Sequence, residues 1–455
     1  MKVERSKPPQ NNGGIKFHLP KFKQFKLNNG MEVLFLQKNH LPIVKISLQV
    51  NCGSKFDPKG KSGLAFLTSY LISEGAGEYN SLQLDEEIEL LGTLFDPSTD
   101  NDIINLSMIT LSEKFERSLE LLALIYQSPL FSEKDFKREK QKLLSKIIQN
   151  QNEPSYVASS NFDKIILGNS FYENSVLGKT EDVKTFTNND VINFHKKYFV
   201  PNNSQLIVVG NIGLKNLQLI LNKYLNLDSL NKIELVKQTF SANHSPQYYF
   251  IHQENAAQSE IRIGHLSNKR NETDYFAKTL ANSILGGQFS SRLNLNLREA
   301  KGFTYGIHSA FVYYKDVGYF EISTSVNGKD TSESILEIQK EIAGLKIKIT
   351  EEEINFAKSY FIRRFPAMFE TNSQIVHNLS TLIRYSLSED YFDNYIENIS
   401  NCTKSEIEKS IAEHIKTDEM IYLVVGNKEI VMPQLKTITN MEIIELDAEG
   451  KIVNF

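Results

Sequence analysis

The chain has 455 residues, with 51 Lys and Arg against 55 Asp and Glu, which gives a formal net charge of −4. A single hydrophobic core rarely serves a chain of this length, so we expect two domains. The near balance of charge excludes the strongly basic face that nucleic-acid binding requires. No apolar run approaches the roughly 20 residues of a membrane helix, and a composition of 40% hydrophobic and 23% charged residues is typical of a soluble globular protein.

The first residues, MKVERSKPPQNNGGIKF, are basic and rich in Pro, Gly and Asn, and no apolar stretch follows the charges. This pattern predicts a flexible N-terminal arm over residues 1–20 and argues against a secretory signal. The two cysteines, Cys52 and Cys402, cannot build a disulfide framework, which favours a reducing compartment. The sequence leaves the compartment unknown: it favours the cytoplasm, and a periplasmic location stays open if a signal has been removed.

The two halves of the chain repeat the same order of segments. LIVVGN at 206–211 recurs as YLVVGN at 422–427, and SEKDFKREKQKLLSKIIQ from Ser132 corresponds to TEEEINFAKSYFIRRFPA from Thr350. Earlier in each half, a strand-like segment precedes an apolar helix: PIVKISLQV before GLAFLTSYLISEG, and SEIRIGHL before DYFAKTLANSILGG. Four matches in one order at a nearly constant offset indicate an internal duplication.

Strand and helix patterns alternate along each half. Strand patterns cover Met31–Leu36, Pro42–Val50, Ile103–Leu111 and Gln205–Val209, and helical periodicity covers Phe115–Tyr126 and Phe136–Ile148. Ser132 and Thr350 precede acidic residues, as helix N-caps do. The pattern predicts an α+β fold of two homologous α/β sandwich units, each a sheet with helices on one face. We expect the first unit over residues 21–230, the second over 245–455, and a linker near 228–246.

One segment of the first unit resembles a known enzyme family. Gly53–Gly75 reads GSKFDPKGKSGLAFLTSYLISEG, which is similar to the opening of the insulinase (pitrilysin) type of zinc metallopeptidase, the group that includes mitochondrial-processing-peptidase-like proteins. In that family the segment carries the inverted zinc motif H-x-x-E-H. Phe171–Asn211, with Gly178 in its GKT triplet, also resembles the end of the family's first unit. The triplet lacks the leading glycine of a phosphate loop, so nucleotide binding is not expected.

The resemblance implies that the zinc site is lost. Phe66 and Tyr70 occupy the two histidine positions, Ser69 the catalytic glutamate position, and Lys146 the position of the third ligand or the one beside it. Zinc needs imidazole, carboxylate or thiolate donors, and none of the nine histidines lies within four positions of another. We therefore expect no metal in this chain, no peptidase activity of its own, and Phe66 and Tyr70 packed in a buried helix.

The second unit keeps a different family motif. LGGQFSSRLNLNLREAKGFTYGIHSAF resembles a segment in which an arginine and a tyrosine seven positions later reach the active site, here Arg298 and Tyr305. We expect Arg298 near the end of a helix stopped by Gly302 and Tyr305 at the start of the next strand. The alternative is a surface salt bridge of Arg298, with Glu299 or Glu321, beside an edge aromatic. Two glycines, Gly286 and Gly287, would form either a flexible loop near substrate or a plain helix C-cap.

In the family, four such units form a chamber in which zinc comes from one half and the Arg/Tyr pair from the other. The resemblance therefore implies a non-catalytic subunit of a heterodimeric zinc endopeptidase, with zinc in an H-x-x-E-H partner and a peptide or unfolded polypeptide as substrate. Two other functions stay open. One is a structural scaffold, as in the core subunits of respiratory cytochrome complexes, and the other is a homodimeric peptide-binding chamber.

Overall fold

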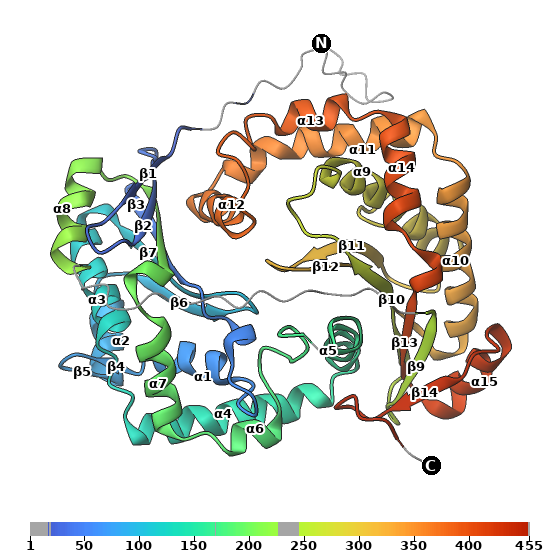
Figure 1. Ribbon diagram of the computed structural model, residues 1–455, viewed down its shortest axis with the longest axis horizontal. Coiled ribbons are helices and arrows are strands. Elements are labelled where there is room, and N and C mark those ends of the chain that lie inside the picture. The colour runs from blue at the N-terminus through green and yellow to red at the C-terminus, as the bar shows by residue number, and fades with distance from the viewer. Residues whose placement is uncertain (1–16, 18–19, 169, 226–244, 454–455) are drawn as a thin grey trace, which may run out of the picture.

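The computed structural model describes residues 17, 20–168, 170–225 and 245–453. The predicted N-terminal arm and the predicted linker lie almost wholly outside the described residues. Two six-stranded sheets, each packed with helices, make up the molecule (Figure 1). Within the described residues, no helix combines the length and the apolar character of a membrane span.

The first sheet has the strand order β1-β2-β8-β3-β7-β6. Its strands are β1 (Lys23–Lys26), β2 (Glu32–Gln37), β3 (Ile43–Val50), β6 (Leu94–Thr99), β7 (Ile104–Leu111) and β8 (Ser204–Gly210), and β4 (Gly75–Ala76) pairs separately with β5 (Tyr79–Asn80). The helices of this half are α1 (Leu64–Leu71), α2 (Ser81–Leu90), α3 (Phe115–Gln127), α4 (Glu133–Gln151), α5 (Pro154–Leu167), α6 (Thr180–Lys184), α7 (Asn188–Tyr198) and α8 (Leu214–Tyr224). The four predicted strands begin and end within one residue of the observed ones.

The second sheet has the order β11-β12-β10-β13-β9-β14. Its strands are β9 (Gln247–His252), β10 (Gln258–Ser267), β11 (Ile307–Tyr313), β12 (Gly318–Asn327), β13 (Ile421–Gly426) and β14 (Ile443–Leu446). Its helices are α9 (Tyr275–Leu285), a π-helix (Asn294–Ala300), α10 (Thr331–Ile347), α11 (Glu351–Arg364), α12 (Asn372–Arg384), α13 (Tyr395–Asn401), α14 (Lys404–His414) and α15 (Lys428–Ile438).

The pairing of the strands confirms the predicted duplication. β2 runs parallel to β8 and β3 antiparallel to it, and β9 and β10 stand in the same relation to β13. The caps also agree, because the side chains of Ser132 and Thr350 accept hydrogen bonds from the third residues of α4 and α11. The outer strands of the two six-stranded sheets differ, because β1 is antiparallel to β2, whereas β14 is parallel to β9. The α+β class and the sandwich units are therefore as predicted.

Each half also lends one helix to the other half. α5, from the first half, packs on β10 and β13, and α12, from the second half, packs on β3 and β8 (Figure 1). Phe162 of α5 is fully buried in a cluster with Leu423 and Val425. The helices of a unit cover one face of its sheet, as predicted, but the exchanged helix covers the other face, which the sequence pattern did not predict.

Polar contacts join the halves near the ends of β6 and β11. The Lys55 ammonium lies 2.6 Å from Asp102 Oδ1 and 2.9 Å from Asp316 Oδ2. The Tyr172 hydroxyl donates to Asp102 at 2.8 Å, and the backbone N–H of Lys315 donates to the other Asp102 oxygen at 2.9 Å. Because Asp102 is buried, this network holds the two halves in one relative position.

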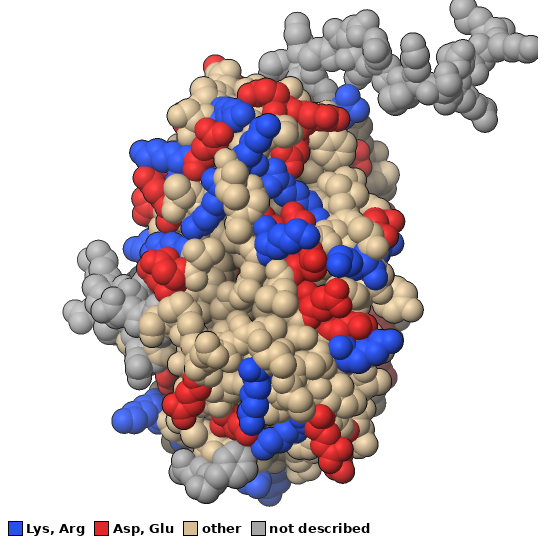
Figure 2. All heavy atoms as spheres, turned by 90° about the vertical axis from the view of Figure 1, so that its right-hand side faces the viewer, with Lys and Arg blue, Asp and Glu red and all other residues tan. Residues whose placement is uncertain are grey.

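The outer face that carries α10, α14 and α15 bears interspersed acidic and basic side chains (Figure 2). No region of a single sign dominates it. Neutral side chains fill much of its middle.

Candidate functional site

Helix α1 carries the positions that correspond to the zinc motif, and a buried turn sets its start. Gly63, the residue before the helix, has φ +94°, and a Cβ there would lie 2.4 Å from the carbonyl oxygen of Leu177. The carboxylate of Asp57 accepts hydrogen bonds from the N–H groups of Gly63 at 2.7 Å and Ala65 at 2.8 Å. Asp57 therefore satisfies the free donors at the helix start, and Gly63 allows the close approach of the two chain segments.

The four predicted positions lie together. The rings of Phe66 and Tyr70 are one helical turn apart with centroids 4.7 Å from each other, and the Lys146 ammonium, from α4, lies 5.3 Å from the Phe66 centroid. The Ser69 hydroxyl donates to the Phe66 carbonyl at 2.8 Å. Lys146 therefore makes a cation–π contact with Phe66, and the Ser69 hydroxyl is hydrogen-bonded to the backbone of its own helix.

The expectation that both aromatic residues are buried is wrong for Tyr70. α1 turns Leu64, Leu67 and Leu71 into the core, so the stripe at positions 66 and 70 faces outward. Phe66 is half-buried, and Tyr70 is 38% exposed. The lost metal positions therefore form an accessible aromatic surface.

The residues at these positions do not fit a zinc ion. Two aromatic rings, a hydroxyl bonded to backbone and an ammonium provide none of the donors that zinc takes from proteins. Across the described ranges, no group of three His, Cys, Asp or Glu side chains is arranged to hold a metal. His195 and His265 are buried in the cores, and burial lowers the pKa of each to about 4. The side chains at these four positions therefore give zinc no ligand set.

Of the second predicted pair, Arg298 lies in the last turn of the π-helix and Tyr305 lies between this helix and β11. The helix ends at Ala300, and Gly302 follows it with φ +69°. Tyr305 lies two residues before β11, so the predicted start of the strand is slightly early. Its side chain is 92% exposed.

The surroundings of Arg298 agree with one of the two expected ion pairs. Its Nε lies 3.6 Å from the carboxylate of Glu299, and its guanidinium carbon lies 4.1 Å from the ring centroid of Phe289, an exposed side chain. Glu321 pairs with Arg262 instead, at 3.4 Å. A partly exposed guanidinium with one distant carboxylate keeps most of its donors open to a further acceptor.

The backbone that carries Arg298 and Tyr305 is firmly held. The Asn294 side chain donates to the Ile307 carbonyl at 2.7 Å and accepts from its N–H at 3.3 Å. The Thr304 hydroxyl lies 2.8 Å from the carbonyl oxygens of Gly306 and Ser325. An anchored backbone with outward side chains can present both groups to another molecule at little cost in entropy.

Gly286 and Gly287 end α9, and the structure agrees with the helix C-cap alternative. Both N–H groups donate to the Asn282 carbonyl, at 2.9 and 2.8 Å, and the Gly286 carbonyl accepts from the Ser309 N–H at 3.1 Å. A Cβ at Gly286 would lie 2.6 Å from the Ser309 hydroxyl. Close packing therefore explains why glycine stands there.

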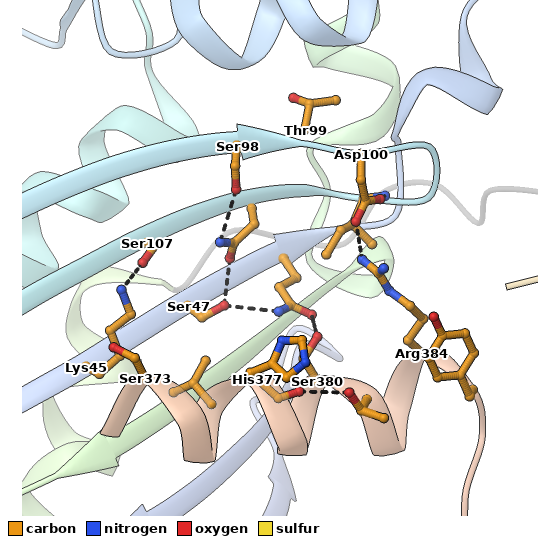
Figure 3. Close-up of a pocket in the computed structure, with 16 residues that line it drawn as sticks. Lys45, Ser47, Ser98, Thr99, Asp100, Ser107, Ser373, His377, Ser380 and Arg384 are labelled. Carbon is orange, nitrogen blue, oxygen red and sulfur yellow. Dashed lines mark hydrogen bonds and ion pairs between the residues drawn. The ribbon is translucent and has the colours of Figure 1, made fainter. Parts of the chain in front are cut away.

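Sequence reasoning missed a polar cavity of about 490 Å³ between the first sheet and α12 (Figure 3). Lys45 and Ser47 of β3 and Ser107 of β7 line it from the sheet, and Ser373 and His377 line it from α12. The alternation of polar and apolar residues along β3 predicts a polar face, but nothing in the sequence indicates that a helix from the other half covers it.

A two-unit α+β chain with a degenerate metal helix is the architecture of an inactive metallopeptidase-type protein. Two family models match this chain: Insulinase (Peptidase family M16) over residues 32–180, and Peptidase M16 inactive domain over residues 185–361. The chain belongs to the peptidase M16 (insulinase) family, as its motifs indicated.

The proteins similar to this chain include some named as peptidases and one named as a non-peptidase homolog. An uncharacterized zinc protease of Rickettsia felis is 25% identical over 345 residues, covering 74% of this chain and 81% of the relative. The non-peptidase homolog YmxG of Helicobacter pylori is 20% identical over 410 residues, covering 89% and 94%. The crystal structure of a peptidase M16 inactive domain from Pseudomonas fluorescens has a TM-score of 0.82 and 24% identity over 90% of this chain and 98% of its own, which shows the shared fold.

Proposed function

We propose that this chain is the non-catalytic subunit of a heterodimeric zinc endopeptidase and supplies Arg298 and Tyr305 to the active site of its partner. One contrast carries the proposal. The metal positions around Phe66 and Tyr70 offer no zinc donor, while Arg298 and Tyr305 stand on a held backbone with exposed side chains. A chain with no role in peptide chemistry would not need an exposed arginine and tyrosine on a held backbone.

The role of the pair follows from the charge that peptide hydrolysis creates. Attack on a peptide carbonyl produces an oxyanion, and a tyrosine hydroxyl and a guanidinium can each donate a hydrogen bond to it or to a neighbouring substrate carbonyl. The zinc ion and the H-x-x-E-H motif would belong to the partner subunit. Gly286 and Gly287, at the end of α9, would border the bound peptide or unfolded polypeptide.

Reconstitution with an H-x-x-E-H subunit tests the proposal. The purified chain should bind no zinc and cleave no peptide, and activity should appear when the partner is added. Arg298→Ala combined with Tyr305→Phe should lower kcat by about 100-fold or more, since removal of one oxyanion donor costs on the order of 3 kcal/mol.

A matched control is available on α11. The Arg364 guanidinium donates to the Tyr360 hydroxyl at 2.7 Å on an exposed surface, so Arg364→Ala with Tyr360→Phe removes the same two side chains elsewhere. This control should retain full activity. An unchanged rate for the Arg298/Tyr305 variant, with its complex intact by analytical ultracentrifugation, would contradict the assigned role.

A second candidate is a structural subunit with no part in proteolysis. The local contacts of Arg298 with Glu299 and Phe289 favour it, because they give this side chain neighbours within its own subunit. In that case the Arg298/Tyr305 variant would change only thermal stability, and no mixture with a homologous subunit would cleave peptides.

A further inference from the structure

The cavity under α12 contains a cation, Lys45, that forms no ion pair with any carboxylate of the described residues. The Lys45 ammonium donates to the Ser107 hydroxyl, and no ion pair of Lys45 within 4.0 Å occurs in the described part of the chain. Lys45 is half-buried, and burial lowers its pKa from the ordinary value. Buried charges are normally paired, so a half-buried ammonium without a carboxylate is a place where an anion gains binding energy.

The other charged groups of the cavity do not neutralise the positive charge of Lys45. Arg384 forms an ion pair with Asp100, so the guanidinium there is already neutralised. Burial and then Arg384 lower the pKa of His377, which is therefore neutral near pH 7. Asp96, which pairs with Ser107 across β6 and β7, is exposed and forms no ion pair with Lys45, and its charge raises the pKa of Lys45 by less than burial lowers it.

The walls beside Lys45 are polar and already ordered. The Gln49 side-chain oxygen accepts from Gln205 at 2.8 Å and from Ser380 at 3.0 Å, and the Ser47 hydroxyl donates to Asn105 at 2.6 Å. The Ser107 oxygen accepts from Lys45, so its own proton can point to a second acceptor. A ligand would meet a rigid surface, which lowers the entropy lost on binding.

We propose that this cavity binds a carboxylate group of a short peptide, held by the Lys45 ammonium and the Ser107 hydroxyl. A single point charge among hydroxyls suits a monoanion, whereas a phosphate dianion is typically held by a guanidinium fork, and the one guanidinium of this cavity is engaged by Asp100. The carboxylate comes either from an acidic side chain or from a peptide C-terminus. The site is independent of the proposed partner subunit and of Arg298 and Tyr305.

Titration calorimetry of the full chain with three blocked tripeptides separates the sources. Acetyl-Ala-Glu-Ala-amide offers a side-chain carboxylate, acetyl-Ala-Ala-Ala a terminal one, and acetyl-Ala-Gln-Ala-amide none. At least one of the first two should bind, with a Kd at least 10-fold lower than that of the Gln peptide. The tighter of the two identifies the source.

Substitutions at the cavity then test the residues. Lys45→Met should weaken the carboxylate peptide at least 10-fold, while Lys134→Met, at an exposed lysine on α4, should leave its Kd unchanged. Asp96→Asn should tighten binding about 2-fold, because it removes a negative charge that repels the carboxylate of the ligand. Asp96 does not line the cavity, so its wall stays unchanged. That gain in affinity cannot result from misfolding.

Three results would overturn the proposal. They are binding of both carboxylate peptides no tighter than that of the Gln peptide, no binding of any tripeptide, and an unchanged Kd in a folded Lys45→Met variant. Arg298→Ala with Tyr305→Phe should bind the carboxylate peptide as the wild type does, so failure of the proposed function and failure of this site give different results.

Discussion

At the scale of single residues, four side chains on α1 and α4 separate this chain from a zinc peptidase. Phe66 and Tyr70 lie one turn apart with rings 4.7 Å from each other, and Lys146 approaches the first of them at 5.3 Å. The backbone therefore still brings the required positions together, although the side chains cannot hold a metal. The helix has kept its place because Asp57 and Gly63 order its start and its leucines fill the core.

This arrangement predicts that donors restored at these positions would bind zinc. The variant Phe66→His, Ser69→Glu, Tyr70→His, Lys146→Glu should take up one zinc per chain, measured by competition with a chromophoric chelator. The triple variant that keeps Lys146 should bind at least 10-fold more weakly, because an ammonium would replace an anionic ligand. Absence of zinc binding in a folded quadruple variant would show that the alignment with H-x-x-E-H is wrong.

At the scale of the elements, the exchange of α5 and α12 joins the two halves. α5 follows α4 directly in the chain, yet its apolar face packs on the second sheet, where Phe162 is fully buried. α12 follows α11 after a short 3-10 helix (Phe365–Phe369) and places Ile375 and Leu379 in a cluster with Val209 of the first sheet. Each half therefore completes the core of the other half, and neither sheet is covered on both faces by its own segments.

Removing the main contact of α5 should destabilise the whole molecule. Phe162→Ala should lower the free energy of unfolding by about 3–5 kcal/mol, because it leaves a cavity beneath a helix that both halves share. Urea unfolding followed by circular dichroism measures this. Leu219→Ala on α8, where the side chain is 71% exposed, is the control and should change stability by less than about 0.5 kcal/mol. Equal effects of the two substitutions would contradict the role of α5.

At the scale of the whole molecule, the joint between α5 and the second sheet contains two carboxyl groups with raised pKa values. Burial raises the pKa of Asp163 to about 6 and that of Glu321 to about 7. Asp163 accepts from the Tyr319 hydroxyl at 2.7 Å, and Glu321 lies 3.4 Å from Arg262. Since both pKa values exceed those of an unfolded chain, the folded state holds more protons between about pH 4 and 7.

Stability should therefore fall as pH rises through this window. Two groups that bind protons more tightly in the folded state contribute stability that is complete below about pH 4 and is lost as pH rises through 6 and 7. Asp163→Asn with Glu321→Gln removes this dependence. Between pH 5 and pH 7.5 the free energy of unfolding of the wild type should fall by about 4 kcal/mol relative to that of the variant. A constant difference across that range would contradict the assignment.

Local patterns in the sequence predicted a large part of this structure. The period-2 runs predicted β2, β3, β7 and β8, the caps Ser132 and Thr350 predicted the starts of α4 and α11, and the repeated segments predicted two sheets of one topology. These features depend on neighbours within a few residues or on order along the chain, so the sequence carries them directly. In the structure the motif positions Phe66, Ser69, Tyr70 and Lys146 lie close together.

Only the tertiary structure decided which helix covers which sheet. The sheet on which α5 or α12 packs depends on contacts between residues more than a hundred positions apart, such as Phe162 with Leu423 and Leu379 with Val209. The same long-range placement leaves Tyr70 exposed, presents Arg298 and Tyr305 outward, and closes the cavity around Lys45. By itself, the sequence determined the family, the duplication and the absence of zinc donors at the motif. The fold determined where the remaining chemical groups meet, because burial and charge pairing depend on the whole molecule.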